Sequence, residues 1–363
     1  MLKALKIIGF TTMLCVVYLA FWPVPIEPKL WEPSEDPGYT GAYAPNNRLE
    51  SFKALSMGST TGPEAAILDA NGDVIASSHE GWLVRFKGGS QDASKWVNLD
   101  GRPLGLDIDD RGNVWVANAY LGLQKVTPSG EVSLELNSVD GTRIGYADDV
   151  AIVNGKIYFS DATMRFYPQD WGGTLPASVL DVVEHGKTGR VIEYDPNTQV
   201  AKVVMTDLNF ANGVAADPNG RFILVNETGE YRVWKLWLSG EKVGVKEVIL
   251  SGLPGFPDNI HTGQNGLYWL GLVDARSKEL DDIASGTFWR KVMVRLPEFM
   301  RPQNPKYGLV IGINQHGDVV ENLQAPNGEV YSTTGLLETD THIFVTSLTA
   351  PFLASITKQN AGL

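Results

Sequence analysis

A short pattern recurs along the chain: an apolar strand, a turn built on Asn-Gly, Arg-Gly or a similar pair, and a second apolar strand. Tight hairpin turns need positive φ angles, which glycine and asparagine adopt most readily. The turn glycines are Gly72, Gly112, Gly155, Gly220 and Gly266, and a degenerate sixth copy at 336–344 lacks the glycine. A chain with this internal repeat is built from repeated β units.

Another strand-like stretch follows each hairpin. Such stretches lie at 81–86, 122–126, 189–194, 231–237, 307–313 and 352–356. Six units of several short strands predict an all-β fold, a six-bladed β-propeller. A β-helix would need shorter and more uniform repeats, and a two-sheet sandwich would not repeat in this way. The stretch 49–57 precedes the first unit, and we expect it to add a strand to the last blade and close the ring.

The N-terminal segment is strongly apolar. Residues 7–22 are interrupted only by Thr11 and Thr12, and Pro23 ends the run. This predicts a cytoplasmic tail at 1–6, a transmembrane signal anchor at 7–23, a linker at 24–48 and the propeller at 49–363. Lys3 and Lys6 precede the run and acidic residues follow it, so the positive-inside rule places the N-terminus in the cytoplasm and the propeller on the periplasmic or extracytoplasmic side.

A cleaved signal peptide has a similar basic start and apolar run. An uncleaved single-pass membrane anchor is favoured because no small-x-small cleavage site follows the run. Tyr18, Trp22 and Trp31 also suit the aromatic belt at a membrane interface. Cys15 does not lie in a convincing lipoprotein motif. It is the only cysteine, so no intramolecular disulfide can form.

Two segments, 162–188 and 275–301, are longer than the repeat requires. The second places Phe288, Trp289, Val292, Met293 and Leu296 at helical spacing. We interpret this stripe either as a helix that caps the propeller or as a lid or membrane-touching helix.

The net charge is −12, from 42 acidic and 30 basic side chains. An acidic chain is not expected to bind nucleic acid, because a phosphate backbone requires a basic surface. The charge is compatible with cation binding.

Aligning the units on their turns reveals a ring of polar residues. Glu64, Asn212 and Asp258 each lie eight residues before a turn glycine, and Asp148 lies seven before a shorter turn. The first strand of each blade lines the channel, so these side chains are expected to converge near the axis. Their oxygen atoms suit a hard cation, Ca²⁺ or another divalent ion. The alternative is a hydrated polar channel with structural acids at strand ends.

The chain resembles the strictosidine-synthase-like propeller family. The resemblance rests on the motifs at 62–64, 102–106, 117–123, 157–161, 189–195, 211–214, 255–260 and 347–353, in the family's order. It implies a relation to paraoxonases, gluconolactonases and diisopropylfluorophosphatase, which hold a catalytic divalent cation, usually Ca²⁺, at the channel centre.

The metal ligands of these relatives follow the pattern Glu, Asn, Asn, Asp. That pattern falls here on Glu64, Asp148, Asn212 and Asp258, with Asn259 as a further ligand. Asp148 departs from the usual asparagine, and the choice between position 148 and its neighbour Asp149 stays open.

Two sets of catalytic residues that these relatives use are replaced by other residues in this sequence. Strictosidine synthase uses a glutamate whose place Thr334 takes here, with Ser332 in the place of a nearby histidine. The histidine pair of paraoxonases is replaced by Leu104 and Ala119. His261 follows Asp258 and Asn259 but is interpreted as an ordinary blade residue.

The favoured function is a membrane-anchored, Ca²⁺-dependent hydrolase of small hydrophobic esters or lactones, of the arylesterase or lactonase type. The cation would polarise the substrate carbonyl, and Asp258 or Glu64 would hold or deprotonate the attacking water. One alternative is a non-catalytic binding propeller with a structural metal. Another is a strictosidine-synthase-like condensation by other residues.

Overall fold

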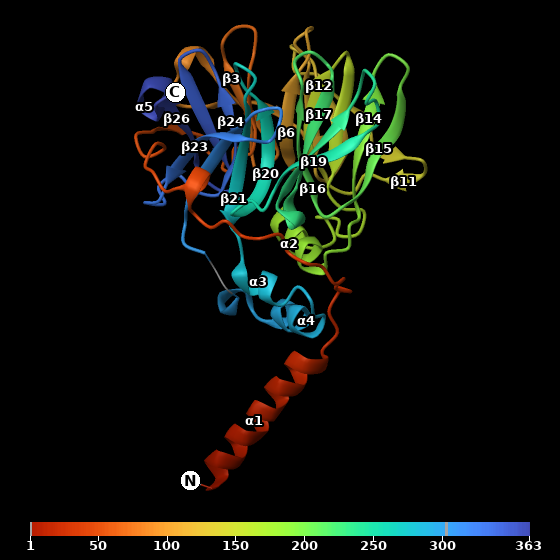
Figure 1. Ribbon diagram of the computed structural model, residues 1–363, viewed down its shortest axis with the longest axis vertical. Coiled ribbons are helices and arrows are strands. Elements are labelled where there is room, and N and C mark those ends of the chain that lie inside the picture. Colours follow the sequence, from red (N-terminus) through yellow and green to blue (C-terminus); the bar gives the residue numbers. More distant parts are fainter. Residues whose placement is uncertain (1, 302–303) are drawn as a thin grey trace.

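The computed structural model describes residues 2–301 and 304–363 (Figure 1). Six four-stranded antiparallel sheets are arranged as the blades of a propeller. The first blade consists of β2 (Ala66–Leu68), β3 (Val74–Ser77), β4 (Trp82–Phe86) and β5 (Ser94–Asn98). The second consists of β6 (Pro103–Ile108), β7 (Val114–Asn118), β8 (Gly122–Val126) and β9 (Val132–Leu136). The third consists of β12 (Ala147–Val153), β13 (Lys156–Asp161), β14 (Gly189–Asp195) and β15 (Val200–Leu208). The predicted six-bladed fold is confirmed.

The next two blades follow the same order, from the channel outward. They consist of β16 (Ala211–Ala216), β17 (Phe222–Glu227), β18 (Arg232–Trp237) and β19 (Lys246–Ser251), and of β20 (Gly255–Thr262), β21 (Tyr268–Ala275), β22 (Gly308–Ile313) and β23 (Val319–Ala325). A small separate hairpin is formed by β10 (Ser138–Val139) and β11 (Thr142–Arg143).

The ring closes by pairing the two ends of the propeller sequence. The sixth blade holds β24 (Thr333–Glu338), β25 (His342–Ser347) and β26 (Phe352–Thr357), and its outer strand is β1 (Lys53–Ser56). β1 pairs antiparallel with β26, with Leu55 opposite Leu353. The closing strand therefore comes from the predicted stretch 49–57.

Apolar side chains between neighbouring blades hold the ring together. The second strands β7 and β17 are buried along their whole length, because a blade covers each of their faces. One such cluster packs Val150, Ile157 and Phe159 of the third blade against Trp115 and Leu123 of the second. Each large apolar side chain buried in this way stabilises the fold by about 1.5–3 kcal/mol. The outermost strands, such as β9, alternate exposed and half-buried residues.

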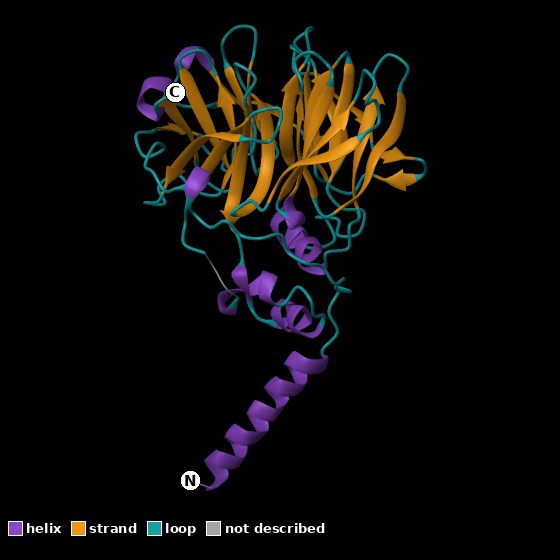
Figure 2. Cartoon of the chain, viewed as in Figure 1, coloured by secondary structure: helices purple, strands orange, loops and turns teal. Residues whose placement is uncertain are grey.

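Apart from short helical turns such as the one at the C-terminus, the helices gather at one end of the propeller (Figures 1 and 2). α2 (Thr174–Glu184) lies against the blades, and α3 (Lys278–Asp282) and α4 (Phe288–Arg295) lie between the propeller and α1 (Leu2–Phe21). α4 confirms the helical spacing predicted within 275–301. The remaining helical turns are η1 (Gly41–Tyr43), η2 (Lys87–Gly89), η3 (Thr228–Glu230), η4 (Glu298–Met300) and α5 (Lys358–Ala361). α1 is long and apolar enough to span a membrane.

Candidate metal centre

A β-bulge recurs at the same point in the inner strands of five blades. In the third blade, Ala147 pairs with Asp161 but Val150 pairs with Phe159, so the inner strand holds one extra residue. The same shift separates Ala211 from Val214 in the fourth blade. It recurs in the second, fifth and sixth blades at 103–106, 257–260 and 333–336. Bulges change the direction of side chains next to functional sites. Here each bulge contains the position that the alignment of the turns places opposite Glu64 of the first blade.

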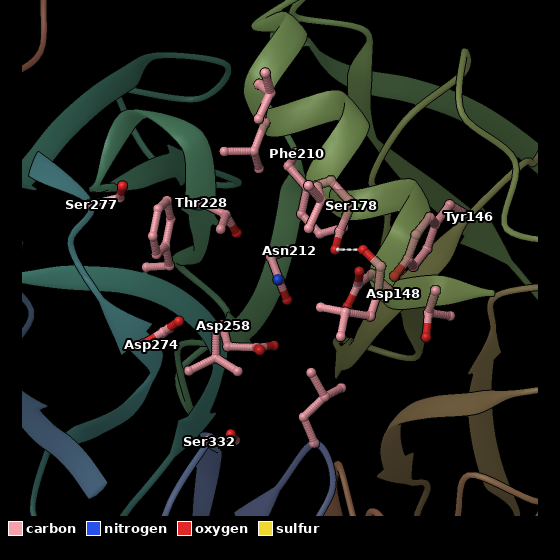
Figure 3. A pocket seen from close by; sticks show the side chains of 18 of the residues that line it. Tyr146, Asp148, Ser178, Phe210, Asn212, Thr228, Asp258, Asp274, Ser277 and Ser332 are labelled. Atoms are coloured by element: carbon pink, nitrogen blue, oxygen red, sulfur yellow. Dashed lines mark hydrogen bonds between the residues drawn. The ribbon is translucent and has the colours of Figure 1, made fainter. Parts of the chain in front are cut away.

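Carboxylates from distant parts of the chain lie together where the inner strands begin. Glu64, Asp148 and Asp258 each offer a carboxylate oxygen, and these atoms lie within 4.8 Å of one another. All three residues are buried, with 2–5% of their surface exposed. Asn212 lines the same cavity, and in Figure 3 its side chain lies between those of Asp148 and Asp258. The four residues that the alignment grouped therefore share one place, although they come from four different blades.

Several buried oxygens at this place have no hydrogen-bond partner among the residues that the structure describes. They are the Oδ1 atoms of Asp148, Asn212, Asp258 and Asn259. The Asn259 amide donates its Nδ2–H to the Glu64 carbonyl at 3.0 Å, which fixes the orientation of the side chain and leaves Oδ1 free. Buried polar atoms are nearly always hydrogen-bonded, so four unpaired oxygens in one cluster indicate a binding site for a ligand such as a cation. Carboxylate and amide oxygens in this number fit a hard divalent cation.

The structure separates the roles of Asp148 and Asp149. Both carboxylate oxygens of Asp149 accept backbone N–H groups, from Val150 at 2.8 Å and from Val214 at 2.9 Å. Asp149 thus ties the third blade to the fourth, whereas Asp148 belongs to the carboxylate cluster. A side chain at position 105 would not fit, because a Cβ atom on Gly105 would lie 2.1 Å from Asp149 Oδ1.

A buried arginine that the sequence reasoning did not single out completes the cluster. The Arg102 guanidinium is almost fully buried and lies 3.0 Å from Glu64 Oε2. Three ionised carboxylates and one guanidinium carry a formal charge of −3 + 1 = −2. That charge matches a divalent cation. Arg102 lies within the motif at 102–106, but the charge of a loop residue alone does not reveal its partner.

The carboxylates have strongly shifted pKa values. Burial raises the pKa of Asp148 and Asp258 well above the usual range, and repulsion from Glu64 raises both further. Burial also raises the pKa of Glu64, against the opposing effect of Arg102. Without a cation these groups would therefore retain protons at a pH where exposed carboxyls are ionised.

We expect cation affinity to increase with pH as a result. A cation must displace the protons that the raised pKa values hold in the cluster, and that competition weakens as pH rises. Calorimetric titration of Ca²⁺ at about pH 6 and about pH 8 should show tighter binding at the higher pH, with proton release on binding. An affinity independent of pH would contradict a site made of these carboxylates.

The cluster lies at the bottom of a cavity of about 350 Å³. Tyr146 and Phe210, which Figure 3 labels, and Phe256 form apolar walls near the carboxylates, and residues of α2, α3 and α4 also line the cavity. Burial, then the neighbouring Asp148, raises the pKa of the Tyr146 hydroxyl, which stays protonated. Such a cavity suits a small ligand with one polar group and an apolar body.

The other sequence candidates lie outside the cluster or are engaged in structure. His261 lines the opposite end of the channel, where burial lowers its pKa to about 4. Asp161 pairs with Arg190 at 2.9 Å. The Thr334 hydroxyl donates to the Glu64 carbonyl at 2.7 Å and lies 2.8 Å from the hydroxyl of Thr346, which can donate to it.

Comparisons with known proteins agree with this architecture. Family models described as strictosidine synthase and as strictosidine synthase-like, N-terminal, match residues 147–241 and 41–86. The adipocyte plasma membrane-associated protein of Salmo salar is 31% identical, over 92% of this chain and 84% of that protein. The Arabidopsis thaliana protein STRICTOSIDINE SYNTHASE-LIKE 10 is 30% identical, over 86% of this chain and 91% of that protein.

Solved structures share the fold at low sequence identity. A gluconolactonase from Xanthomonas campestris has a TM-score of 0.62 at 15% identity, covering 92% of this chain and 98% of that one. A calcium-binding regucalcin from Agrobacterium tumefaciens has a TM-score of 0.57 at 15% identity, covering 84% and 93%.

Proposed function

The chain belongs to the strictosidine synthase-like propeller family, and from this premise we propose that it is a metal-dependent hydrolase of esters or lactones. The observation that carries the proposal is the set of orphaned oxygens around Glu64, Asp148 and Asp258 at the bottom of an apolar cavity. The gluconolactonases among the structural neighbours support a lactone or ester as the substrate class.

The ligands of the cation would be Glu64, Asp148, Asn212, Asp258 and Asn259. A divalent cation, for which Ca²⁺ is the leading candidate, would act as a Lewis acid and polarise the substrate carbonyl. Asp258 is the preferred proton acceptor, because its Oδ1 accepts no hydrogen bond from the residues that the structure describes. Glu64 is less suited to that role, because Arg102 holds one of its oxygens.

The cavity walls favour a hydrophobic acyl or aryl group. Phe210 and Phe256 lie near the carboxylates, and Val182, Leu280 and Met293 line the helical side. A substrate would bury its apolar body against these side chains while its carbonyl faces the carboxylate cluster. Water would be excluded from the apolar part, which strengthens polar interactions with the reacting group.

We assign membrane attachment to α1. The helix is apolar, and the Salmo salar relative is named for its association with the plasma membrane. Lys3 and Lys6 at its start favour an N-terminus in the cytoplasm and a propeller on the opposite side.

Hydrolysis of aryl acetates and lactones by the full chain in detergent or lipid tests the proposal. We expect turnover that EDTA removes and added Ca²⁺ restores, because the cluster cannot polarise a carbonyl without its cation. Turnover that survives complete metal removal would overturn the metal-dependent mechanism.

A binding propeller with a structural metal is the second candidate. The cluster and the adjacent Asn212 come from four blades, so a cation there would also hold the ring together. This candidate predicts a melting temperature that falls with EDTA, together with no hydrolysis of any ester or lactone tested. Because a catalytic metal also stabilises the fold, turnover is the measurement that separates the two candidates.

A further inference from the structure

The insert between β21 and β22 contains α3, α4 and η4, and we refer to residues 278–300 as the helical insert. It is joined to the end of α1 by hydrogen bonds. Arg295 donates from Nε to the Trp22 carbonyl at 2.6 Å and from Nη1 to the Leu19 carbonyl at 2.8 Å. The Tyr18 hydroxyl donates to the Arg295 carbonyl at 3.2 Å. The last carbonyls of a helix have no partner within the helix, so the insert caps the C-terminus of α1.

The helical insert is also fixed to the propeller. Arg290 is fully buried and donates to the carbonyls of Lys29 in the linker, Val183 in α2 and Ala284 in the insert. A buried guanidinium that satisfies several carbonyls joins these segments into one unit. The insert therefore has a defined position between α1 and the propeller, as Figure 1 shows.

The helical insert, which is hydrogen-bonded to the end of α1, exposes large apolar side chains. Phe299 is 83% exposed and Trp289 is 61% exposed, and Phe288 and Met300 are also exposed. Soluble proteins rarely expose a group of large apolar side chains, and such groups mark a contact surface. Trp22, which follows α1 directly, is also exposed, and aromatic residues favour the membrane–water interface.

We propose that the helical insert lies in the interfacial layer of the membrane that α1 spans, and that hydrophobic substrates enter the cavity from the lipid. A bilayer is the occupant because the exposed face continues a candidate membrane span to which Arg295 joins it directly. α4 has the amphipathic character of helices that lie in an interface, with Phe288 and Trp289 exposed and Arg290 buried.

The cavity supports the second half of the proposal, which rests on the proposed hydrolase function. Met293 of α4 and Leu280 of α3 line the cavity, while Phe288 and Trp289 of the same insert are exposed. The insert therefore separates the cavity from the surface that would contact lipid. Leu175 and Val179 of α2 line the cavity and are themselves exposed, which provides an apolar path toward its mouth. The substrate class is an ester or lactone with a long acyl chain that partitions into a bilayer.

The position of the insert can be tested without any activity. In the full chain with Cys15→Ser, a Phe299→Cys variant is labelled with the fluorophore NBD and reconstituted into phosphatidylcholine vesicles. The control is Asp110→Cys, in the exposed turn between β6 and β7 at the other end of the propeller. We expect a blue-shifted emission and quenching by doxyl-labelled lipid at position 299 alone. Equal quenching of both labels by aqueous iodide, with no quenching by doxyl lipid, would overturn the proposal.

The route of entry requires a second measurement. A Phe288→Ser/Trp289→Ser variant should raise KM for a long-chain ester in vesicles about tenfold, from lost lipid contact, and leave KM for a water-soluble short-chain ester unchanged. Val243→Ser, an exposed apolar residue in the turn after β18, is the matched control. Equal KM changes for both esters would overturn entry from lipid. If the wild-type chain hydrolyses neither ester, the proposed function fails, and the quenching result still decides the position of the insert.

Discussion

Replacing Asp258 by alanine is expected to lower kcat/KM for ester or lactone hydrolysis by at least about 100-fold, the usual contribution of a positioned general base. The carboxylate lies in the cluster with Glu64 and Asp148, and its Oδ1 has no hydrogen-bond partner in the part of the chain that the structure describes. The substitution would remove both a cation ligand and the preferred proton acceptor. Steady-state kinetics with saturating Ca²⁺ measure the loss, and calorimetric titration shows how much of it reflects weaker cation binding.

Asp274→Asn provides a matched control. Asp274 lines the same cavity, but it accepts hydrogen bonds from Asn304 and from its neighbour Ala275 and is not part of the cluster. We expect this variant to keep wild-type turnover. Equal activity of the wild type and a folded Asp258→Ala variant would remove the proposed mechanism, and equal losses in both variants would show that the effect is not specific to the cluster.

The fold could be predicted because its local signals are strong and repeated. Turn glycines such as Gly72 and Gly112 adopt positive φ angles of 80° and 79°, as the hairpin prediction requires. Each turn marks a hairpin, and six hairpins in one chain leave few architectures that bury every apolar face. The closing strand was also predictable, because an extra β segment before the first blade has only the last blade to pair with.

The placement of the site residues followed partly from the same repeat. Aligning the turns grouped Glu64, Asp148, Asn212 and Asp258, since equivalent positions of a propeller face one axis. The choice between Asp148 and Asp149 could not be made from sequence, because the bulge that directs them differently appears only in the strand pairing. Their role as cation ligands stays a prediction.

Arg102 shows what local sequence signals do not reveal. It lies at the start of the second blade and pairs with Glu64 at the start of the first, 38 residues away. Neither the turn pattern nor the strand pattern predicts a contact between residues at the entry of neighbouring blades. α2 was not predicted either, since the segment 162–188 was recognised only as longer than the repeat requires.

Arg102→Met is expected to destabilise the metal-free protein by about 3–5 kcal/mol near neutral pH, the usual cost of removing one partner from a buried ion pair. The positive charge of the Arg102 guanidinium lowers the pKa of Glu64, Asp148 and Asp258 and so opposes the effect of their burial. Its removal leaves buried carboxylates that repel one another. Chemical denaturation in EDTA measures the change in the free energy of unfolding.

The loss of unfolding free energy caused by Arg102→Met should depend on pH. A carboxyl whose pKa is raised by folding binds more protons in the folded than in the unfolded state, so folding is favoured as pH falls into that range. The destabilisation of Arg102→Met should therefore be largest at high pH and smaller in mild acid, where the cluster is protonated. Saturating Ca²⁺ should offset part of it at neutral pH, because the cation supplies the missing positive charge.

A double-mutant cycle with Glu64→Gln tests whether the loss comes from the ion pair. Arg102 Nη2 lies 3.0 Å from Glu64 Oε2, so neutralising Glu64 removes the charge that Arg102→Met leaves unpaired. Most of the lost stability should return in the Arg102→Met/Glu64→Gln variant. If the two substitutions instead add to within about 0.5 kcal/mol, they act independently, and Arg102 stabilises the blade entry by packing rather than by compensating the carboxylate cluster.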